Sequence, residues 1–192
     1  WEVGTDLRFF KNRLRFDYAY YTTQVSDQIF TTSVPRSTGV STYVTNAGDY
    51  ETWGHELLVS GDIIKNEKIN WELIYNFSTN EGKVLDLPDD IDNITYASDG
   101  GPEIFARVKE GDKMGSIYGY KYRRENNGEL YIDSNGYPTI DQREGYVKIG
   151  NAFPDFVMSL GSNFRYKNLT FNFLVEWSEG GDIGLRAEPG RD

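Results

Sequence analysis

Residues that commonly carry out acid–base or nucleophilic chemistry are sparse in this sequence. His55 is the single histidine, and none of the 192 residues is a cysteine. A histidine-based triad needs a hydroxyl nucleophile held by the ring, and no Gly-x-Ser-x-Gly segment supplies one. Phosphate-binding loops of the Gly-x-Gly-x-x-Gly or Gly-x-x-x-x-Gly-Lys type are missing as well. We therefore expect no catalytic residue, no enzymatic activity and no cofactor.

Carboxylates are the most abundant chemical groups, with 30 Asp and Glu residues. The richest stretch, from Asp86 to Asp92, lacks the Asp-x-Asn-x-Asp-Gly spacing and the bidentate glutamate of a calcium loop. Asp133-Ser134-Asn135-Gly136 begins like such a loop, but Tyr137-Pro138 interrupts it. A solvated loop and a hairpin turn explain the two stretches, so we expect no metal site.

Composition limits the class of protein. The formal charge of -10 argues against a nucleic-acid partner, because phosphate binding depends on a Lys/Arg surface. No apolar run approaches the roughly 18 to 20 residues that a membrane helix needs. The mean hydropathy of -0.60 is typical of soluble proteins, but also of membrane β-barrels, whose strands alternate apolar and polar residues.

Alternation with period two dominates the sequence. The clearest example starts at Leu169, where apolar side chains stand at every second position up to Trp177. Six segments have one apolar and one polar face, and the apolar faces carry no Asp, Glu, Lys or Arg. These predicted strands span about residues 2–10, 13–25, 54–64, 69–80, 156–166 and 169–177.

The connections between the predicted strands fall into two kinds. Lys11-Asn12, residues 65–68 and Lys167-Asn168 are short polar turns that join antiparallel neighbours. Two long loops, about 26–50 and 81–155, separate the resulting pairs. Short turns at one end of a sheet and long loops at the other are typical of an outer-membrane barrel.

We therefore predict an all-β fold, an antiparallel up-and-down meander that forms about six strands of a large transmembrane β-barrel with long extracellular loops. Strands of nine to eleven residues match the length of a tilted membrane crossing, and aromatic residues near the strand ends match interfacial girdles. The alternative is a sandwich, in which the apolar faces meet in a shared core.

Two groups of residues remain as candidates for binding. Polar-face residues would line the lumen of a barrel, either as structural charge and amide networks or as substrate contacts. The second long loop contains a strand-like stretch and the turns Asn127-Gly128 and Asn135-Gly136, which predict a small extracellular hairpin. The lumen-facing candidates are Arg13, Arg15, Asp17, Glu56, Asp62, Glu72, Asn76, Asn163, Arg165, Asn172 and Glu176, and the loop candidates for contact with substrate or a lid are Tyr118, Tyr120, Tyr122 and Tyr131.

Several short motifs occur in an order and spacing that are fairly specific. They are Glu2-Val3-Gly4-Thr5-Asp6-Leu7, Asn12-Arg13-Leu14, Tyr20-Tyr21, Ser37-Thr38-Gly39, Asn46-Ala47-Gly48, Gly54-His55-Glu56, Trp71-Glu72, Asn76-Phe77-Ser78, Gly119-Tyr120-Lys121-Tyr122, Gly150 to Phe156 and Gly180-Gly181-Asp182-Ile183. In these motifs, from Trp1 to Ile183, the chain resembles the barrel region of SusC/RagA-type TonB-dependent outer-membrane transporters. Residues 184–192 do not share the resemblance.

The resemblance implies a bacterial outer-membrane protein with a plugged barrel of about 22 strands, of which this chain would supply about six as one partial barrel region over residues 1–192. It implies import of glycans or peptides, and contacts with outer-membrane lipid. The partners that it implies are TonB and a SusD-like surface lipoprotein, which would act through parts of the parent protein outside this chain.

Two other functions fit parts of the pattern. A soluble all-β carbohydrate-binding module would use exposed Trp and Tyr side chains to stack on sugar rings. A fragment of a glycoside hydrolase is supported only by the number of carboxylates. The first alternative differs from the importer in what the apolar face contacts, namely a protein core instead of lipid.

Overall fold

The computed structural model describes residues 1–33, 39, 42–46, 48–88, 91–98 and 104–183. Parts of four sequence features lie outside the described residues: Ser37, Thr38, Ala47, Asp89, Asp90 and residues 184–192. The chain divides into two compact units. The first comprises Trp1–Val25, Tyr50–Lys83 and Pro154–Gly180, and the second comprises Ser26–Asp49, Val84–Phe153 and Gly181–Asp192.

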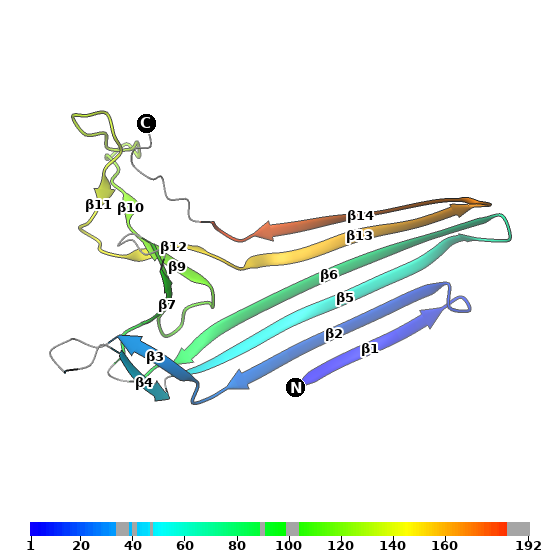
Figure 1. Cartoon of the computed structure of the whole chain (residues 1–192), viewed down its shortest axis with the longest axis horizontal. Coiled ribbons are helices and arrows are strands. Elements are labelled where there is room, and N and C mark those ends of the chain that lie inside the picture. The colour runs from blue at the N-terminus through cyan, green and yellow to red at the C-terminus, as the bar shows by residue number, and fades with distance from the viewer. Residues whose placement is uncertain (34–38, 40–41, 47, 89–90, 99–103, 184–192) are drawn as a thin grey trace. The chain divides into compact units, whose positions relative to one another are not determined.

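A six-stranded antiparallel sheet makes up the first unit (Figure 1). Its strands follow one another in chain order except for the segments that belong to the second unit, so the sheet is an up-and-down meander, which confirms the predicted fold class. The strands, in spatial order, are β1 (Glu2–Phe9), β2 (Leu14–Val25), β5 (Asp49–Lys65), β6 (Ile69–Asp86), β13 (Pro154–Tyr166) and β14 (Leu169–Gly180).

Two strands are longer than their apolar pattern. β5 begins at Asp49 where the alternation begins at Gly54, and β6 continues to Asp86 where the alternation ends near residue 80. The added segments carry Glu51 and Glu81 at positions in phase with the apolar side chains. The backbone ladder continues there, as the pairing of Glu51 with Gln24 shows, although no apolar residue marks it.

Three short turns connect β1 to β2, β5 to β6 and β13 to β14, all at one end of the sheet (Figure 1). The first uses three consecutive left-handed residues, Phe10, Lys11 and Asn12, and the third uses Lys167 in the same conformation. In the second, Asn66 Oδ1 accepts hydrogen bonds from two backbone N–H groups, those of Lys68 and Ile69. Such local amide–backbone bonds are typical of turn residues.

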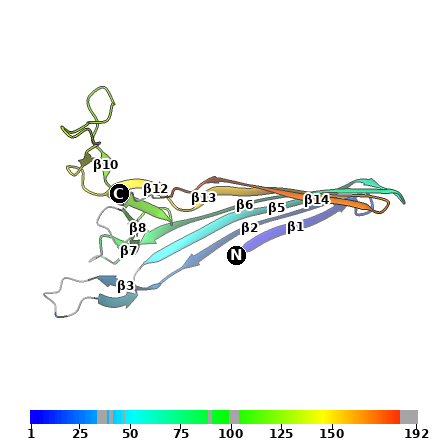
Figure 2. The same cartoon turned by 45° about the horizontal axis from the view of Figure 1, so that its top comes forward.

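The sheet is a single layer, as the turned view shows (Figure 2). Within the described part of this unit no second sheet covers the apolar face, and Phe171 is 59% exposed. A sandwich would bring Leu14, Trp71 and Phe171 into one enclosed interior. These three residues instead lie on separate strands, β2, β6 and β14, of one sheet.

The second unit contains smaller β-structures. A four-stranded sheet has the order β12 (Val147–Asn151), β9 (Ser116–Gly119), β8 (Ile104–Val108) and β7 (Ile94–Ser98). Separate two-stranded ladders join β3 (Ile29–Ser33) to β4 (Thr42–Asn46) and β10 (Lys121–Tyr122) to β11 (Ile140–Asp141). The unit has a small buried cluster of Val84, Leu87, Ile94 and Val108.

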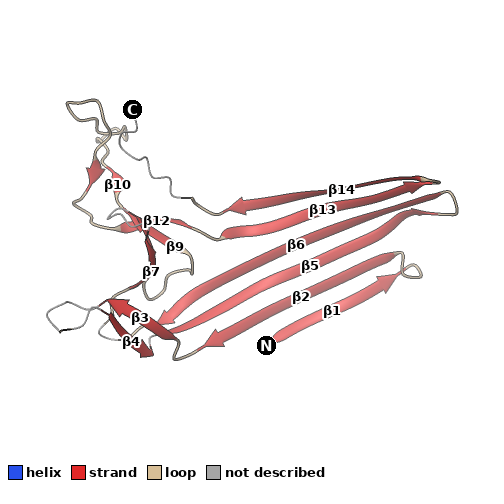
Figure 3. Cartoon of the chain, in the orientation of Figure 1, coloured by secondary structure: helices blue, strands red, loops and turns tan. Residues whose placement is uncertain are grey.

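Strands are the regular secondary structure of the described residues (Figure 3). Within those residues, no helix is long and apolar enough to span a membrane.

Candidate functional site

The strand register divides the sheet into two chemically different faces. Residues that are directly paired across an antiparallel ladder share a face, so Trp71, Phe164 and Phe171 form one continuous apolar row across β6, β13 and β14. On β14 every second residue from Leu169 to Trp177 belongs to the same face. A band nine residues long agrees with the roughly 9–11 residues of a tilted membrane strand.

His55 lies on the apolar face, toward the end of the band that is far from the short turns. Its Nδ1 atom is 2.8 Å from the hydroxyl oxygen of Tyr18, and its ring centroid is 4.9 Å from that of Tyr20. Trp1 extends the group, with its ring centroid 5.4 Å from that of Tyr20. The histidine is thus part of an aromatic cluster at the edge of the apolar band.

A charge network occupies the opposite, polar face where β1 pairs with β2. Arg15 Nη2 donates to Asp17 Oδ2 at 2.7 Å and to Asp6 Oδ2 at 3.3 Å. Arg8 donates to both oxygens of Asp6, at 3.2 and 3.3 Å. Two arginines and two aspartates therefore neutralise one another on this part of the wall. The Nε atom of Arg15 is buried without a hydrogen-bond partner among the described residues.

On β6, β13 and β14 the polar face carries asparagine side chains. Asn163 Nδ2 donates to Glu72 Oε2 at 3.0 Å, and Asn163 pairs directly with Asn172 on the next strand. Further along β6, on the same face, Asn76 Nδ2 donates to Ser159 Oγ of β13 at 3.1 Å. These bonds hold polar groups across neighbouring strands without any ligand.

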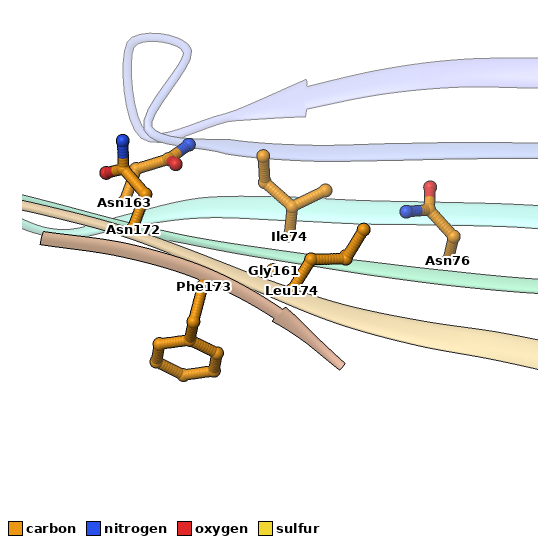
Figure 4. Close-up of a pocket in the computed structure, with 7 residues that line it drawn as sticks. All are labelled: Ile74, Asn76, Gly161, Asn163, Asn172, Phe173 and Leu174. Carbon is orange, nitrogen blue, oxygen red and sulfur yellow. The ribbon is translucent and has the colours of Figure 1, made fainter. Parts of the chain in front are cut away.

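A depression of about 420 Å³ lies between the two groups of amides (Figure 4). Gly161 forms its floor, because the absent side chain leaves space between Ile74 and Leu174, its partners in the register. A Cβ atom at Gly161 would meet these two side chains at 3.7 Å, an ordinary contact distance. Phe173, which also borders the depression, points to the other side of the sheet in Figure 4.

The structure distributes the lumen-facing candidates along this wall. Arg13 lies in the turn before β2 and donates to the backbone oxygens of Asp62 and Ile63, at 3.1 and 3.4 Å. Asp62 lies near the end of β5 and forms an ion pair with Lys65. The others are in phase with the polar face: Arg15, Asp17, Glu56, Glu72, Asn76, Asn163, Arg165, Asn172 and Glu176.

The polar face also carries apolar residues. Ile74 and Leu174 interrupt the alternation, and so does Leu58, which pairs with Asp17. Each stands between apolar neighbours in sequence, so it reads as part of a continuous run. Their common phase with the polar residues nevertheless assigns Ile74 and Leu174 to this face from the sequence, and the register agrees.

The loop tyrosines have different environments. Tyr118 is only 6% exposed, and its hydroxyl donates to Asp112 Oδ2 at 2.7 Å. Burial, supported by this bond, raises the pKa of Tyr118 to about 12. Tyr122 is 57% exposed, and Tyr131 lies under the guanidinium of Arg123, 4.1 Å from its ring centroid. Tyr118 therefore supports the loop, while Tyr122 is accessible.

Tyr120 belongs to a half-buried aromatic group that the sequence did not single out. Its ring centroid is 4.4 Å from that of Tyr146, which meets Phe105 edge-on at 4.9 Å. The guanidinium of Arg107 lies over both Phe105 and Tyr146, at 4.9 and 5.5 Å. These residues come from β8, from the connection after β9 and from the segment before β12, so no sequence spacing relates them.

Acidic residues of the loop unit mostly organise turns. Asp141 accepts a two-pronged hydrogen bond from Arg143, and this bond lowers the pKa of Asp141 to about 2. Asp133 Oδ1 accepts from the backbone N–H groups of Asn135 and Tyr137, which lowers the pKa of Asp133. In the part of the chain that the structure describes, no group of three or more potential ligands could hold a metal ion.

The curated proteins to which this chain is similar include several TonB-dependent receptors. No family model matches the chain. It is 31% identical over 205 residues to TonB-dependent receptor P3 of Formosa agariphila, an alignment that covers 95% of this chain and 20% of the receptor. It is 28% identical over 189 residues to TonB-dependent receptor SusC of Bacteroides thetaiotaomicron, covering 93% of this chain and 19% of that protein.

Solved structures show the same fold. The RagAB peptide importer in its closed-closed state matches with a TM-score of 0.70 and 18% identity, covering 94% of this chain and 21% of the matched one. A further structure of the RagAB peptide transporter matches with a TM-score of 0.68 and 17% identity, covering 89% of this chain and 20% of the other. The chain thus spans about one fifth of the length of its relatives. Together with the six-stranded meander, these matches confirm the resemblance seen in the sequence: the chain belongs to the SusC/RagA family of TonB-dependent receptors, which are outer-membrane proteins and not enzymes.

Proposed function

We propose that this chain forms a section of the barrel wall of an importer for glycans or peptides, with its long loops directed toward substrate or a surface lid. The observation that carries the proposal is the chemistry of the two faces of the sheet. One face is an uncovered apolar band, and the other is a wall of paired charges and amides.

The apolar band suits direct contact with lipid tails. Phe171, Phe173 and Val175 are all exposed in the first unit, and each points to the same face of β14. In water such a surface would favour aggregation or association. In a bilayer it is stable, since lipid-facing and lumen-facing residues alternate along barrel strands.

The polar face suits an aqueous or plugged lumen. Its arginine–aspartate ion pairs and its amide hydrogen bonds form within the wall itself, so we propose a mainly structural role for Arg15, Asp17 and Asn163. Remaining polar groups would be satisfied by water or by the backbone of a plug domain. The depression at Gly161 offers a bulky group in the lumen a place on this wall.

Substrate class and partners come from the relatives and belong to the whole receptor. The matched structures are named as the RagAB peptide importer. Because the resemblance to the SusC/RagA family implies glycans as well as peptides, oligosaccharides and peptides are the two substrate classes that we propose. A SusD-like lipoprotein at the loops and TonB, acting through segments outside this chain, would complete the machinery. Among the four loop tyrosines named from the sequence, Tyr122 is the exposed one and is the candidate for contact with substrate or lid.

Growth on defined nutrients tests the import function. A strain in which the gene of the intact receptor is deleted should lose growth on particular oligosaccharides or peptides as sole nutrient, and the wild-type gene should restore it. A complemented strain with Gly161→Phe should assemble the receptor but import more slowly if the lumen is used. Unchanged growth of the deletion strain on every nutrient of both classes would contradict the proposal.

A further inference from the structure

The short-turn end of the sheet has a charge opposite to that of the whole chain. Residues 10–13, 62–68 and 165–168 contain six cations and two anions, a formal charge of +4, although the chain carries -10. We call the six residues the turn-end cations; they are Lys11, Arg13, Lys65, Lys68, Arg165 and Lys167. All six are exposed.

The opposite end of the same sheet is acidic. Within the first unit, which contains β5 from Tyr50 and β6 up to Lys83, five carboxylates lie beyond or at the far edge of the apolar band. Lys83 is the single cation that accompanies them there, which gives a formal charge of -4. The five carboxylates are Glu2, Glu51, Glu81, Asp155 and Glu179. The apolar band therefore separates a cationic edge from an anionic edge within one unit.

Hydrogen bonds join the three turns into one continuous edge. The backbone N–H of Asp62 donates to the carbonyl oxygen of Arg13 at 2.8 Å, which ties the first turn to the end of β5. The N–H of Lys167 donates to the oxygen of Lys68 at 2.9 Å, which ties the second turn to the third. Figure 1 shows the three turns at the same end of the sheet. The turn-end cations therefore lie along one continuous edge of the sheet.

Three of the six turn-end cations are available for an external anion. Lys65 is paired with Asp62, and Arg13 is engaged with backbone oxygens. Among the described residues, no carboxylate pairs with Lys11, Lys68 or Lys167.

Aromatic residues place these cations at the level of a lipid headgroup. The Nζ atom of Lys167 lies 5.2 Å from the ring centroid of Tyr166, the last strand residue before the turn. Phe10, at the tip of the first turn, is 76% exposed next to Lys11. Aromatic and basic side chains at the edge of an apolar band are typical of the membrane interface, where Lys extends its amine toward the headgroups.

We infer that three of the turn-end cations, Lys11, Lys68 and Lys167, bind the headgroups of anionic phospholipids in the leaflet that the short turns face. The group that they bind is a headgroup phosphate whose negative charge is not neutralised within the lipid, because basic residues beside a membrane surface are attracted to anionic lipids. The acidic far edge would repel such lipids, so the charge pattern also favours one orientation of the wall. The inference rests on the proposed contact of the apolar face with lipid.

Spin-labelled lipids test the inference on the intact receptor in phosphatidylcholine bilayers. The motionally restricted component of the spectrum gives the association of labelled phosphatidylglycerol relative to labelled phosphatidylcholine. One variant combines Lys11→Gln, Lys68→Gln and Lys167→Gln. A matched control combines Lys83→Gln, Lys121→Gln and Lys148→Gln, three exposed lysines away from the turns.

The wild type should prefer phosphatidylglycerol, the turn variant should lower this preference toward equality, and the control variant should retain it. Added salt should weaken the preference of the wild type, because exposed charges are screened. Equal preference ratios for the wild type and the turn variant would overturn the inference while leaving lipid contact intact. Absence of any motionally restricted lipid would instead overturn the proposed lipid contact, and the inference with it.

Discussion

Trp71 and Ser162 are joined across β6 and β13 on the apolar face, where Trp71 Nε1 donates to Ser162 Oγ at 3.1 Å. Ser162 is only 3% exposed, so its hydroxyl is withdrawn from the surface that the neighbouring aromatic residues present. The bond explains how a serine is accommodated within an apolar band. It also satisfies the indole N–H, which lipid tails could not do.

Loss of this hydrogen bond should destabilise the receptor. Ser162→Ala leaves the indole N–H of Trp71 unpaired, and we expect a cost of about 0.6 kcal/mol, with an upper bound of roughly 1.7. A double-mutant cycle with Trp71→Phe, measured by unfolding of the intact receptor in lipid, isolates the coupling between the two side chains. If the change in unfolding free energy of the double variant equals the sum of the changes of the two single variants, the bond contributes nothing to stability.

A charge at the middle of the apolar band should impair membrane assembly. Phe173 is the central apolar position of β14, so Phe173→Arg should cost roughly 2–4 kcal/mol if that position lies at the bilayer midplane. Correctly assembled receptor in the outer membrane is the measured quantity.

Asn172→Arg is the matched control, since Asn172 is adjacent in sequence and on the polar face. It should assemble much better than Phe173→Arg. Equal tolerance of the two substitutions would contradict the assigned faces of β14.

Two glycines of β5 should respond differently to alanine. At Gly54 a Cβ atom would clash with the backbone oxygen of Thr79 and with the hydroxyl oxygen of Tyr21. At Gly61 the nearest atom would be 3.6 Å away. Gly54→Ala should therefore destabilise the receptor by about 1–3 kcal/mol, the range of overpacking effects, while Gly61→Ala should be tolerated. If the two variants unfold at the same midpoint, the close approach of Tyr21 to Gly54 is refuted.

The Asp141–Arg143 pair should make the stability of the loop unit sensitive to acid. The pKa of Asp141 is about 2 in the folded chain against an ordinary value of 3.8. Because the folded pKa is the lower one, the ionised carboxylate contributes stability above about pH 4, and this contribution is lost as the pH falls toward 2. A carboxyl NMR titration should place the midpoint of Asp141 well below 3.8.

Arg143→Gln should move that midpoint upward, while Arg124→Gln should leave it in place, since Arg124 donates to the oxygen of Gly128 and not to Asp141. An unchanged midpoint in Arg143→Gln would show that the arginine does not hold the carboxylate.

The sequence predicted the sheet well because its main determinant is local. Alternation identifies a strand without reference to its neighbours, and the turns after Phe9, Lys65 and Tyr166 are short enough to imply hairpin pairing. The extensions of β5 and β6 were missed because charged residues such as Glu51 and Glu81 end the apolar signal, although the backbone ladder continues.

Features that depend on register were not predictable in the same way. The depression at Gly161 requires Ile74, Gly161 and Leu174 to lie in one row, and these residues are far apart in the sequence. The burial of Tyr118 depends on its hydrogen bond to Asp112, which an alternation pattern does not contain. Long-range pairing, and not residue type, decides these sites.

Single-cysteine labelling along β14 is the most direct test of which face of the wall contacts lipid and which faces water. The chain contains no cysteine, so single replacements can be made at residues 170–175, with the unsubstituted intact receptor as the control for background labelling. A membrane-impermeant maleimide applied to the receptor in lipid bilayers should label positions 170, 172 and 174, and should not label positions 171, 173 and 175. Equal labelling of both sets, or labelling of the odd positions alone, would contradict the account of an apolar face in lipid and a polar face toward water.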